Sequence, residues 1–355
     1  MGSRFSWAPT AYKMLDGIFC IFKPPGLPVF RAVESIQRNL ASDLNALPCY
    51  EYEIPLTRSQ PIAENETETS LSIEAEPVSL QNWSEHRLVL GPRFETSDFR
   101  IRFVDGMSSS ASGILVLGIG RHGQRFIDLI AQAKYLRVYH LKGRFGWATD
   151  NFTAKGRVLE RTSYKHVTRS KLEKVCAAVQ AAYSKQMHVL SGVDPDSQEA
   201  YEMASSGIIR PAKRHTSPLL YGVRCIDFQL PDFTLEVHSI NEQGPLLNRL
   251  IHDIAVKLKT LAVCSGVRRL RYGHFTLDRA LVRQQWHLEQ IVDNIESNED
   301  LLTPDKLLVG ARAEKVKLLP PRGKGVLLPG PGDAQPDSCD TADENVSNFG
   351  QNSDR

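Results

Sequence analysis

The sequence lacks the patterns that mark a metal centre, a disulfide scaffold or a membrane anchor. Its six cysteines are scattered and form no CxxC pair, which excludes the usual zinc and disulfide spacings and is typical of a reducing compartment. The histidines show no HxH or HxxxH spacing, so we predict no metal site. No apolar run reaches the roughly 18 residues that span a bilayer, so we predict no membrane span.

The chain also lacks a strong charge of either sign. Its 43 basic and 41 acidic side chains leave a net charge of +2, which excludes a protein that binds nucleic acid through bulk charge alone. With 355 residues and 41% hydrophobic residues, the chain is long enough for one large or two ordinary globular domains. Any RNA-binding argument must therefore rest on where the basic residues lie.

Three segments stand apart in composition. Residues 1–16 are predicted to be a leader, with three interpretations open: a mitochondrial presequence, an N-myristoylation signal at Gly2, or an unremarkable flexible start. Residues 51–86 are acidic and irregular, which predicts a surface insertion. Residues 298–355 become rich in Pro, Gly, Asp, Asn and Ser and are predicted to form a flexible, largely disordered tail, basic at its start.

Between these segments, residues 17–297 alternate strand-like and helical patterns without βαβ regularity, which predicts an α+β domain. Strands are predicted at 17–22, 101–104, 113–120, 139–145 and in two segments around a turn at 231–232, with a short one from Phe275. Helices are predicted at 31–47, 122–134, 168–184 with Thr168 as N-cap, 246–261 and 281–295.

Five separated segments resemble, in the right order, the motifs of TruB-type RNA pseudouridine synthases. They are KPPG after a strand at 18–26, ASGILVLG at 111–118, GWATDNF at 146–152, AYEMA at 200–204 and VRRLRYGHF at 267–275. The resemblance implies a mainly antiparallel mixed sheet flanked by helices. The chain resembles the eukaryotic, mitochondrial TruB-like branch, and nothing in its tail resembles the PUA domain that bacterial members append.

The resemblance implies that the chain isomerises uridine to pseudouridine in tRNA, rRNA or mRNA, as a monomer, without metal or organic cofactor. It implies a mitochondrial location, with the cytoplasm or nucleus as alternatives. The target base must leave its stack before a side chain can reach the sugar. In the family an aspartate attacks, an arginine pairs with that aspartate, and a tyrosine packs on the flipped base.

Two of these family positions are substituted. Anchoring on residues 111–113 places Ser108 at the aspartate, and Asn248 falls at the arginine. A serine hydroxyl is not ionised at neutral pH and needs a neighbouring base to attack. Asp105 is the only nearby carboxylate. In an extended segment it lies about 10 Å from position 108 and on the opposite face, so it is either a substitute nucleophile brought in by a bulge at Gly106 or a solvated turn residue.

Tyr139 matches the stacking tyrosine, and it is either a platform for the flipped base or a packed core residue. Basic residues surround it and recur in the 267–275 motif, where they predict contacts with RNA phosphates or, alternatively, a solvated charged face. Within the 267–275 motif, one arginine is expected to pack structurally. These predicted RNA-binding residues are Lys134, Arg137, Lys142, Arg144, Arg268, Arg269 and Arg271.

Two functions remain open from the residues. One is an active synthase that uses Asp105 and Tyr139, and the other is a non-catalytic RNA-binding or scaffold protein that keeps the synthase cleft. A third alternative, a protein-interaction domain, is disfavoured by the basic clusters.

Overall fold

The computed structural model describes residues 4–49, 91–192, 194, 196–205, 218–242 and 244–307. The strands are β1 Gly17–Lys23, β2 Ile101–Phe103, β3 Ser112–Ile119, β4 Arg137–Phe145, β5 Trp147–Thr149, β6 Val158–Arg161, β7 Leu219–Gln229, β8 Asp232–Ile240, β9 Ala262–Tyr272 and β10 Phe275–Thr276. The α-helices are α1 Ala8–Met14, α2 Val29–Ala46, α4 Gly120–Ala133, α5 Arg169–Ser191, α6 Gln198–Ser205, α7 Gly244–Lys257, α8 Leu288–Asn298 and α9 Pro304–Leu307. Short 3-10 turns are η2 Thr96–Asp98, η3 Leu277–Arg279, η4 Arg283–Gln285 and η5 Glu299–Leu301.

One eight-stranded sheet organises the chain. Its order is β1-β3-β9-β4-β8-β7, with β2 on β3 and β10 on β9. Among the pairings between the described strands, only β3 with β9 is parallel, so the predicted mainly antiparallel α+β sheet is confirmed. A separate hairpin pairs β5 with β6.

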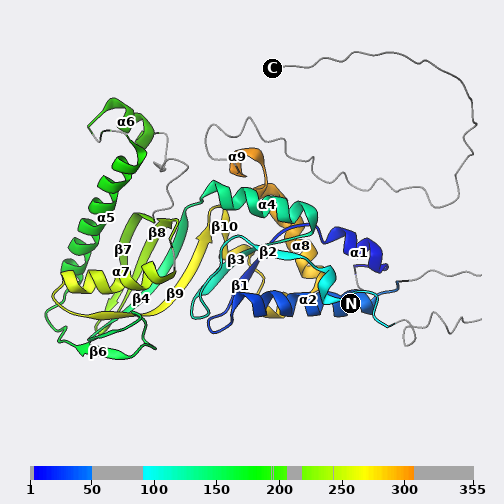
Figure 1. Ribbon diagram of the computed structural model, residues 1–355, viewed down its shortest axis with the longest axis horizontal. Helices are drawn as coiled ribbons and strands as arrows, with labels where there is room; N and C mark the ends of the chain where they lie inside the picture. The colour runs from blue at the N-terminus through cyan, green and yellow to red at the C-terminus, as the bar shows by residue number, and fades with distance from the viewer. Residues whose placement is uncertain are drawn as a thin grey trace, which may run out of the picture. The chain divides into compact units, whose positions relative to one another are not determined.

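Helices cover the two halves of the sheet separately. In Figure 1, α2, α4 and α8 lie around β1 to β3, while α5 and α7 lie beside β4, β7, β8 and β9. Helix α2 buries Ile36, Leu40 and Leu44 at helical spacing, and these side chains pack with Phe19 of β1 and Leu117 of β3 in one core. A second core lies between α5, α7 and the other half of the sheet. The two halves of the sheet meet where β3 pairs with β9.

Gly113 allows this central contact. Its φ is +122°, and a Cβ at this position would lie 2.1 Å from the Arg269 backbone oxygen. Only glycine adopts this conformation and permits this approach.

The N-terminal segment that we predicted to be a leader packs on the domain from residue 4 onward. Phe5, Ala8 and Ala11 are buried in the first core, and the Arg4 guanidinium pairs with Asp293 and Glu296 of α8. The interpretation as a flexible start is therefore wrong from residue 4 onward. The mitochondrial presequence and the myristoylation signal at Gly2 stay predictions, and residues 1–3 lie outside the described part.

Two predicted boundaries are corrected. The last long helix begins at Leu288 rather than 281, because residues 281–287 run through an extended bridge and the turn η4. The domain continues past 297 through η5 and α9, where Leu301 and Leu307 are buried. The predicted insertion at 51–86 and most of the predicted tail, from residue 308, lie outside the described residues.

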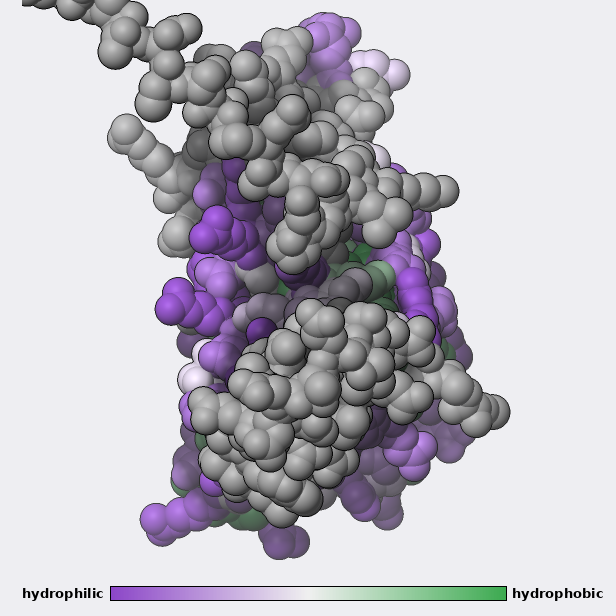
Figure 2. Space-filling model, turned by 90° about the vertical axis from the view of Figure 1, so that its right-hand side faces the viewer, coloured by the Kyte–Doolittle hydropathy of each residue, from purple (hydrophilic) through white to green (hydrophobic). Residues whose placement is uncertain are grey.

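Within the described ranges, no helix is both long and apolar enough to cross a membrane. On the face shown in Figure 2, the described residues are mainly hydrophilic, and hydrophobic residues show only in small areas between them.

Candidate active site

A cavity of about 290 Å³ lies where the segment between β2 and β3 passes over β4, β9 and the start of α7. All three side chains that we singled out for catalysis, Asp105, Ser108 and Tyr139, line this cavity. The segment 104–111 is not a strand, so the alternation that would turn Asp105 away from Ser108 does not apply. The cavity is lined by Asp105, Gly106, Met107, Ser108, Ala111, Arg137, Tyr139, Glu242, Gly244, Leu247, Asn248, Val267 and Arg269.

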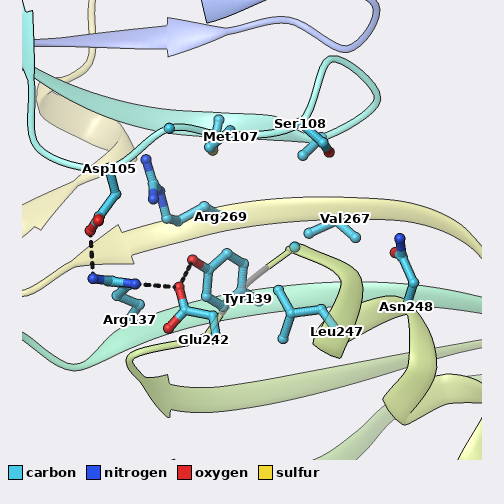
Figure 3. A pocket seen from close by; sticks show the side chains of 13 residues that line it. Asp105, Met107, Ser108, Arg137, Tyr139, Glu242, Leu247, Asn248, Val267 and Arg269 are labelled. Carbon is cyan, nitrogen blue, oxygen red and sulfur yellow. Dashed lines mark hydrogen bonds and ion pairs between the residues drawn. The ribbon is translucent and has the colours of Figure 1, made fainter. Parts of the chain in front are cut away.

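Arg137 holds two carboxylates at one end of the cavity (Figure 3). Its Nη2 lies 2.5 Å from Oδ2 of Asp105, and its Nη1 donates to Oε1 of Glu242 at 2.7 Å. The side chains of Arg137 and Glu242 are 8% and 3% exposed, whereas that of Asp105 is 34% exposed. Of these two carboxylates, Asp105 is therefore the more accessible to a substrate.

The charge of Arg137 is secured by its surroundings. Burial lowers the pKa of Arg137, but the electrostatic influence of the Tyr272 phenol oxygen and of the Glu242 and Asp105 carboxylates raises it above its ordinary value. Tyr272 also donates its hydroxyl to Asp105 Oδ2 at 2.7 Å. The Asp105 carboxylate is thus fixed by two donors and retains an exposed side.

Tyr139 is both a core residue and a cavity wall. It is 4% exposed within the second core, and its hydroxyl donates to Glu242 Oε1. Burial raises the pKa of Tyr139, and the nearby Arg269 opposes that rise without cancelling it. The hydroxyl therefore carries its proton at neutral pH. Tyr139 is therefore a packed core residue that also borders the cavity, and its role as a platform for the flipped base stays a prediction.

The segment over the cavity is anchored by a buried lysine from the KPPG turn. Lys23 is fully buried, and its ammonium donates to the carbonyls of Pro24, Leu27 and Ser109 at 3.1, 2.7 and 3.2 Å. Burial, and to a lesser degree the charge of Arg269, lowers the pKa of Lys23 to about 8. This lysine ties the first motif to the segment that carries Ser108.

Ser108 and Asn248 lie at the other end of the cavity. Figure 3 shows Ser108 separated from Asp105 by Met107 and on the same side as Asn248. The Ser108 hydroxyl is 3.2 Å from that of Ser110, and no general base contacts it among the described residues. The family resemblance predicts an ion pair at these two positions, but this chain has the neutral hydroxyl of Ser108 and the carboxamide of Asn248. These two side chains are therefore polar and uncharged.

The predicted RNA-binding residues divide into buried and exposed groups. Arg137 and Arg269 are buried rather than on the predicted charged surface, Arg269 at 2% exposure with its Nε donating to the Ile114 carbonyl at 2.9 Å. Arg269 is thus the arginine of its motif that packs structurally. Lys134 is half-buried at the left-handed end of α4. The exposed group is Lys142, Arg144, Arg268 and Arg271.

The exposed basic group lies on the other face of the sheet. Side chains alternate along β4, so Lys142 and Arg144 point away from the face of Tyr139. Arg268 pairs with His140, which shares their face, and its guanidinium lies 5.5 Å from the Phe22 ring centroid. These exposed side chains therefore lie on the face of the sheet opposite the Tyr139 ring, and their contacts with RNA phosphates stay a prediction.

Glu236 of β8 organises this reverse face. It accepts from Arg224 at 2.7 Å and from His238 at 2.9 Å. Although burial raises the pKa of Glu236, these hydrogen bonds lower it to about 2. The side chain is 12% exposed, so the carboxylate is a structural counter-charge for this face.

No metal cluster accompanies the cavity. Among the described residues, no group of three or more His, Cys, Asp or Glu could hold an ion. The charged and polar side chains at the cavity form ion pairs and a hydrogen bond between a phenol and a carboxylate.

Comparison with known proteins identifies the family. Residues 103–243 match the model of the TruB family pseudouridylate synthase N-terminal domain. The chain is 38% identical over 321 residues to the human mitochondrial pseudouridylate synthase TRUB2, covering 90% of this chain and 92% of that protein. The mouse protein of the same name is 39% identical over 286 residues, covering 80% and 84%. The chain therefore belongs to the TruB family of pseudouridylate synthases, as the motifs indicate.

Within that family the similarity is uneven. Human TRUB1 is 26% identical over 209 residues, covering 59% of this chain and 58% of that protein. The match to TRUB2 is closer and longer, so the chain is of the mitochondrial TruB-like type.

Sequence reasoning did not assign three residues, Glu242, Leu247 and Val267, to the cavity wall. Glu242 follows β8 in a segment with no recognisable motif, and Val267 and Leu247 were taken only as motif or helix residues. Glu242 is adjacent to Asn241, whose φ of +57° turns the chain between β8 and α7. An acidic residue at such a turn is usually solvated, so only the tertiary structure distinguishes it.

Proposed function

We propose that this protein is an RNA pseudouridine synthase that takes a flipped-out uridine into the cavity and uses the Asp105 carboxylate as its nucleophile. The observation that carries the proposal is the Asp105–Arg137 ion pair at 2.5 Å beside the ring of Tyr139. The family motif pairs an aspartate with an arginine at the positions of Ser108 and Asn248. This chain pairs the same two residue types, Asp105 and Arg137, at other positions in the sequence. A carboxylate supplies an anionic oxygen at neutral pH.

The proposed reaction consists of two successive displacements at C1′ of the ribose. Asp105 attacks C1′ of the ribose while the glycosidic bond electrons leave with N1 of uracil. The freed base turns within the cavity, and C5 attacks C1′ as the carboxylate leaves with its electron pair. Loss of the C5 proton and protonation of N1 complete the isomerisation. Holding the base in the cavity makes the second attack effectively intramolecular.

Tyr139, Leu247 and Val267 supply the walls for the base. An aromatic ring beside a flipped pyrimidine contributes about 1–3 kcal/mol of stacking. Beyond the flipped nucleotide, the exposed group Lys142, Arg144, Arg268 and Arg271 binds phosphates of the same RNA, which is a tRNA, rRNA or mRNA.

Conversion of uridine in RNA tests the nucleophile. RNA from mitochondria is incubated with each protein, and pseudouridine is mapped by chemical adduct formation and primer extension. Asp105→Asn is expected to reduce conversion by about 10³-fold or more, because the amide cannot attack. Asp128→Asn is the matched control, since that aspartate is 54% exposed on α4 and pairs only with Arg102. Full conversion by Asp105→Asn would disprove the assignment.

A non-catalytic RNA-binding function is the second candidate, favoured by one observation. Ser108 and Asn248 stand where the motif requires an ion pair, and neither is charged. If that function holds, the wild-type protein binds RNA without converting it, and the pair Ser108→Asp with Asn248→Arg restores conversion. Conversion by the wild type would exclude the scaffold function.

We also propose a mitochondrial location, supported by the names of the TRUB2 relatives, and action as a monomer. Fractionation of cells that express the tagged chain tests the first, and light scattering of the purified protein tests the second. Absence from the mitochondrial fraction would contradict the location. The role of residues 1–16 in targeting, or of Gly2 in myristoylation, stays a prediction.

A further inference from the structure

Glu242 is the most completely engaged carboxylate at the cavity. It accepts from the Arg137 guanidinium at 2.7 Å, from the Tyr139 hydroxyl and from the Ser239 hydroxyl at 3.2 Å. Its side chain is 3% exposed. A group so enclosed has little surface for the substrate, so any role in chemistry must pass through a side chain that it contacts.

The two carboxylates on Arg137 have different exposures and therefore different roles. Asp105 is the more exposed one, and its negative charge is lost while it is esterified to the ribose. Glu242 remains beside Arg137 during that interval, so the buried guanidinium is never without a counter-charge. The charge balance of the site therefore does not depend on Asp105 alone.

The reaction also needs a base for the C5 proton. Tyr139 borders the cavity, but its hydroxyl carries a proton, since burial raises the pKa of Tyr139. A protonated phenol can accept a proton only if it passes its own proton on. The one acceptor that its hydroxyl contacts, among the described residues, is Oε1 of Glu242.

We infer that Glu242 is a positioning residue that takes the Tyr139 hydroxyl proton as Tyr139 accepts the proton from C5 of the base. This inference rests on the proposed function. The C5–H electron pair becomes the C5–C6 double bond, the electron pair of the C6–N1 double bond moves to N1, and N1 takes a proton from water. Glu242 then returns its proton to solvent through Tyr139, so no proton or electron is gained overall.

The alternative role of Glu242 is to neutralise Arg137 without moving a proton. Both roles predict slower turnover by Glu242→Gln, because the amide keeps the shape and loses the charge. They differ in which step becomes slow. Only a proton-accepting Glu242 makes cleavage of the C5–H bond rate-limiting when it is lost.

The test is the hydrogen isotope effect at C5, measured on an RNA that carries uridine or 5-deuteriouridine at the converted position. For Glu242→Gln we expect kcat to fall by about 10²-fold, KM to stay within a few-fold of wild type, and the deuterium effect on kcat to rise well above that of wild type. Glu173→Gln is the matched control, because that carboxylate is 50% exposed on α5 and pairs with Arg169.

A fall in kcat with an unchanged isotope effect would overturn the inference and leave the proposed function standing. A wild-type protein that makes no pseudouridine would overturn both. If Glu242→Gln does not fold, Tyr139→Phe decides, because it removes the relayed proton and should raise the isotope effect in the same way. Wild-type turnover by Tyr139→Phe would refute the relay.

Discussion

Replacing Arg137 by methionine tests whether this arginine is a buried counter-charge or a surface contact for RNA. The guanidinium lies 2.7 Å from Glu242, a separation worth about 6 kcal/mol of attraction at an effective dielectric constant of 20. Desolvation of both groups offsets most of that gain. Removing one partner nevertheless leaves a buried charge uncompensated, so we expect Arg137→Met to lower the free energy of unfolding by about 3–5 kcal/mol.

The double substitution separates charge from packing. Glu242→Gln alone should lower the free energy of unfolding by about 1–3 kcal/mol, because the amide oxygen still accepts from Tyr139 while Arg137 loses one charged partner. Once Arg137 is methionine, Glu242→Gln removes the stranded charge and should recover about 2 kcal/mol. The double variant is therefore expected to be more stable than Arg137→Met.

Urea unfolding followed by tryptophan fluorescence and circular dichroism measures these free energies. Equal denaturant slopes in the four proteins would show that the comparison concerns one transition. In parallel, the salt dependence of RNA affinity is measured for Arg137→Met. A loss of stability below about 1 kcal/mol, together with a salt slope reduced by about one, would refute the buried-pair reasoning and restore Arg137 to the RNA surface.

Three further predictions concern stability. The folded-state pKa of Glu236, about 2 against an ordinary 4.5, adds stability that is complete above pH 4.5 and is lost as pH falls towards 2. This contribution is at most about 3 kcal/mol, and denaturant titrations at several pH values should show it in wild type and not in Glu236→Gln. Gly113→Ala should lower the unfolding free energy by about 3 kcal/mol or more, because its Cβ would meet the Arg269 backbone. Gly266→Ala, whose Cβ would make only an ordinary contact with Lys142 Cβ at 4.0 Å, is the control, and equal losses would contradict this. Lys23→Met should lower the free energy of unfolding by about 2–4 kcal/mol in the same assay, since three carbonyls lose a charged donor. An unchanged free energy of unfolding would contradict the anchoring role.

Most of the fold follows from local pattern. The apolar run 113–119 can be buried only as a central strand, and the alternation through 139–145 gives a strand with two different faces. One exception is β9, which the sequence indicated only as the arginine-rich motif 267–275. Its strand character depends on pairing with β3 and β4, and pairing between distant segments is not encoded in the local sequence.

The family motifs also identified the segments that meet at the cavity. They placed Tyr139 and the segment around Ser108 together, and the structure has both on its wall. They did not indicate the partners of the charges. Arg137 and Lys142 belong to the same basic strand, yet one is buried between two carboxylates and the other is exposed on the reverse face.

By itself, the sequence determined the family and the α+β class and predicted that Ser108 and Asn248 stand at the family's catalytic positions, because these depend on residue identity and on periodicities of a few residues. The tertiary structure alone decided that Asp105 faces the cavity, that Arg137 is its partner, and that Glu242 joins them. The reason is physical: the energy of a charge depends on its burial and on the groups within a few ångströms. Here those groups come from positions more than 30 residues apart in the chain, brought together by the order of the sheet.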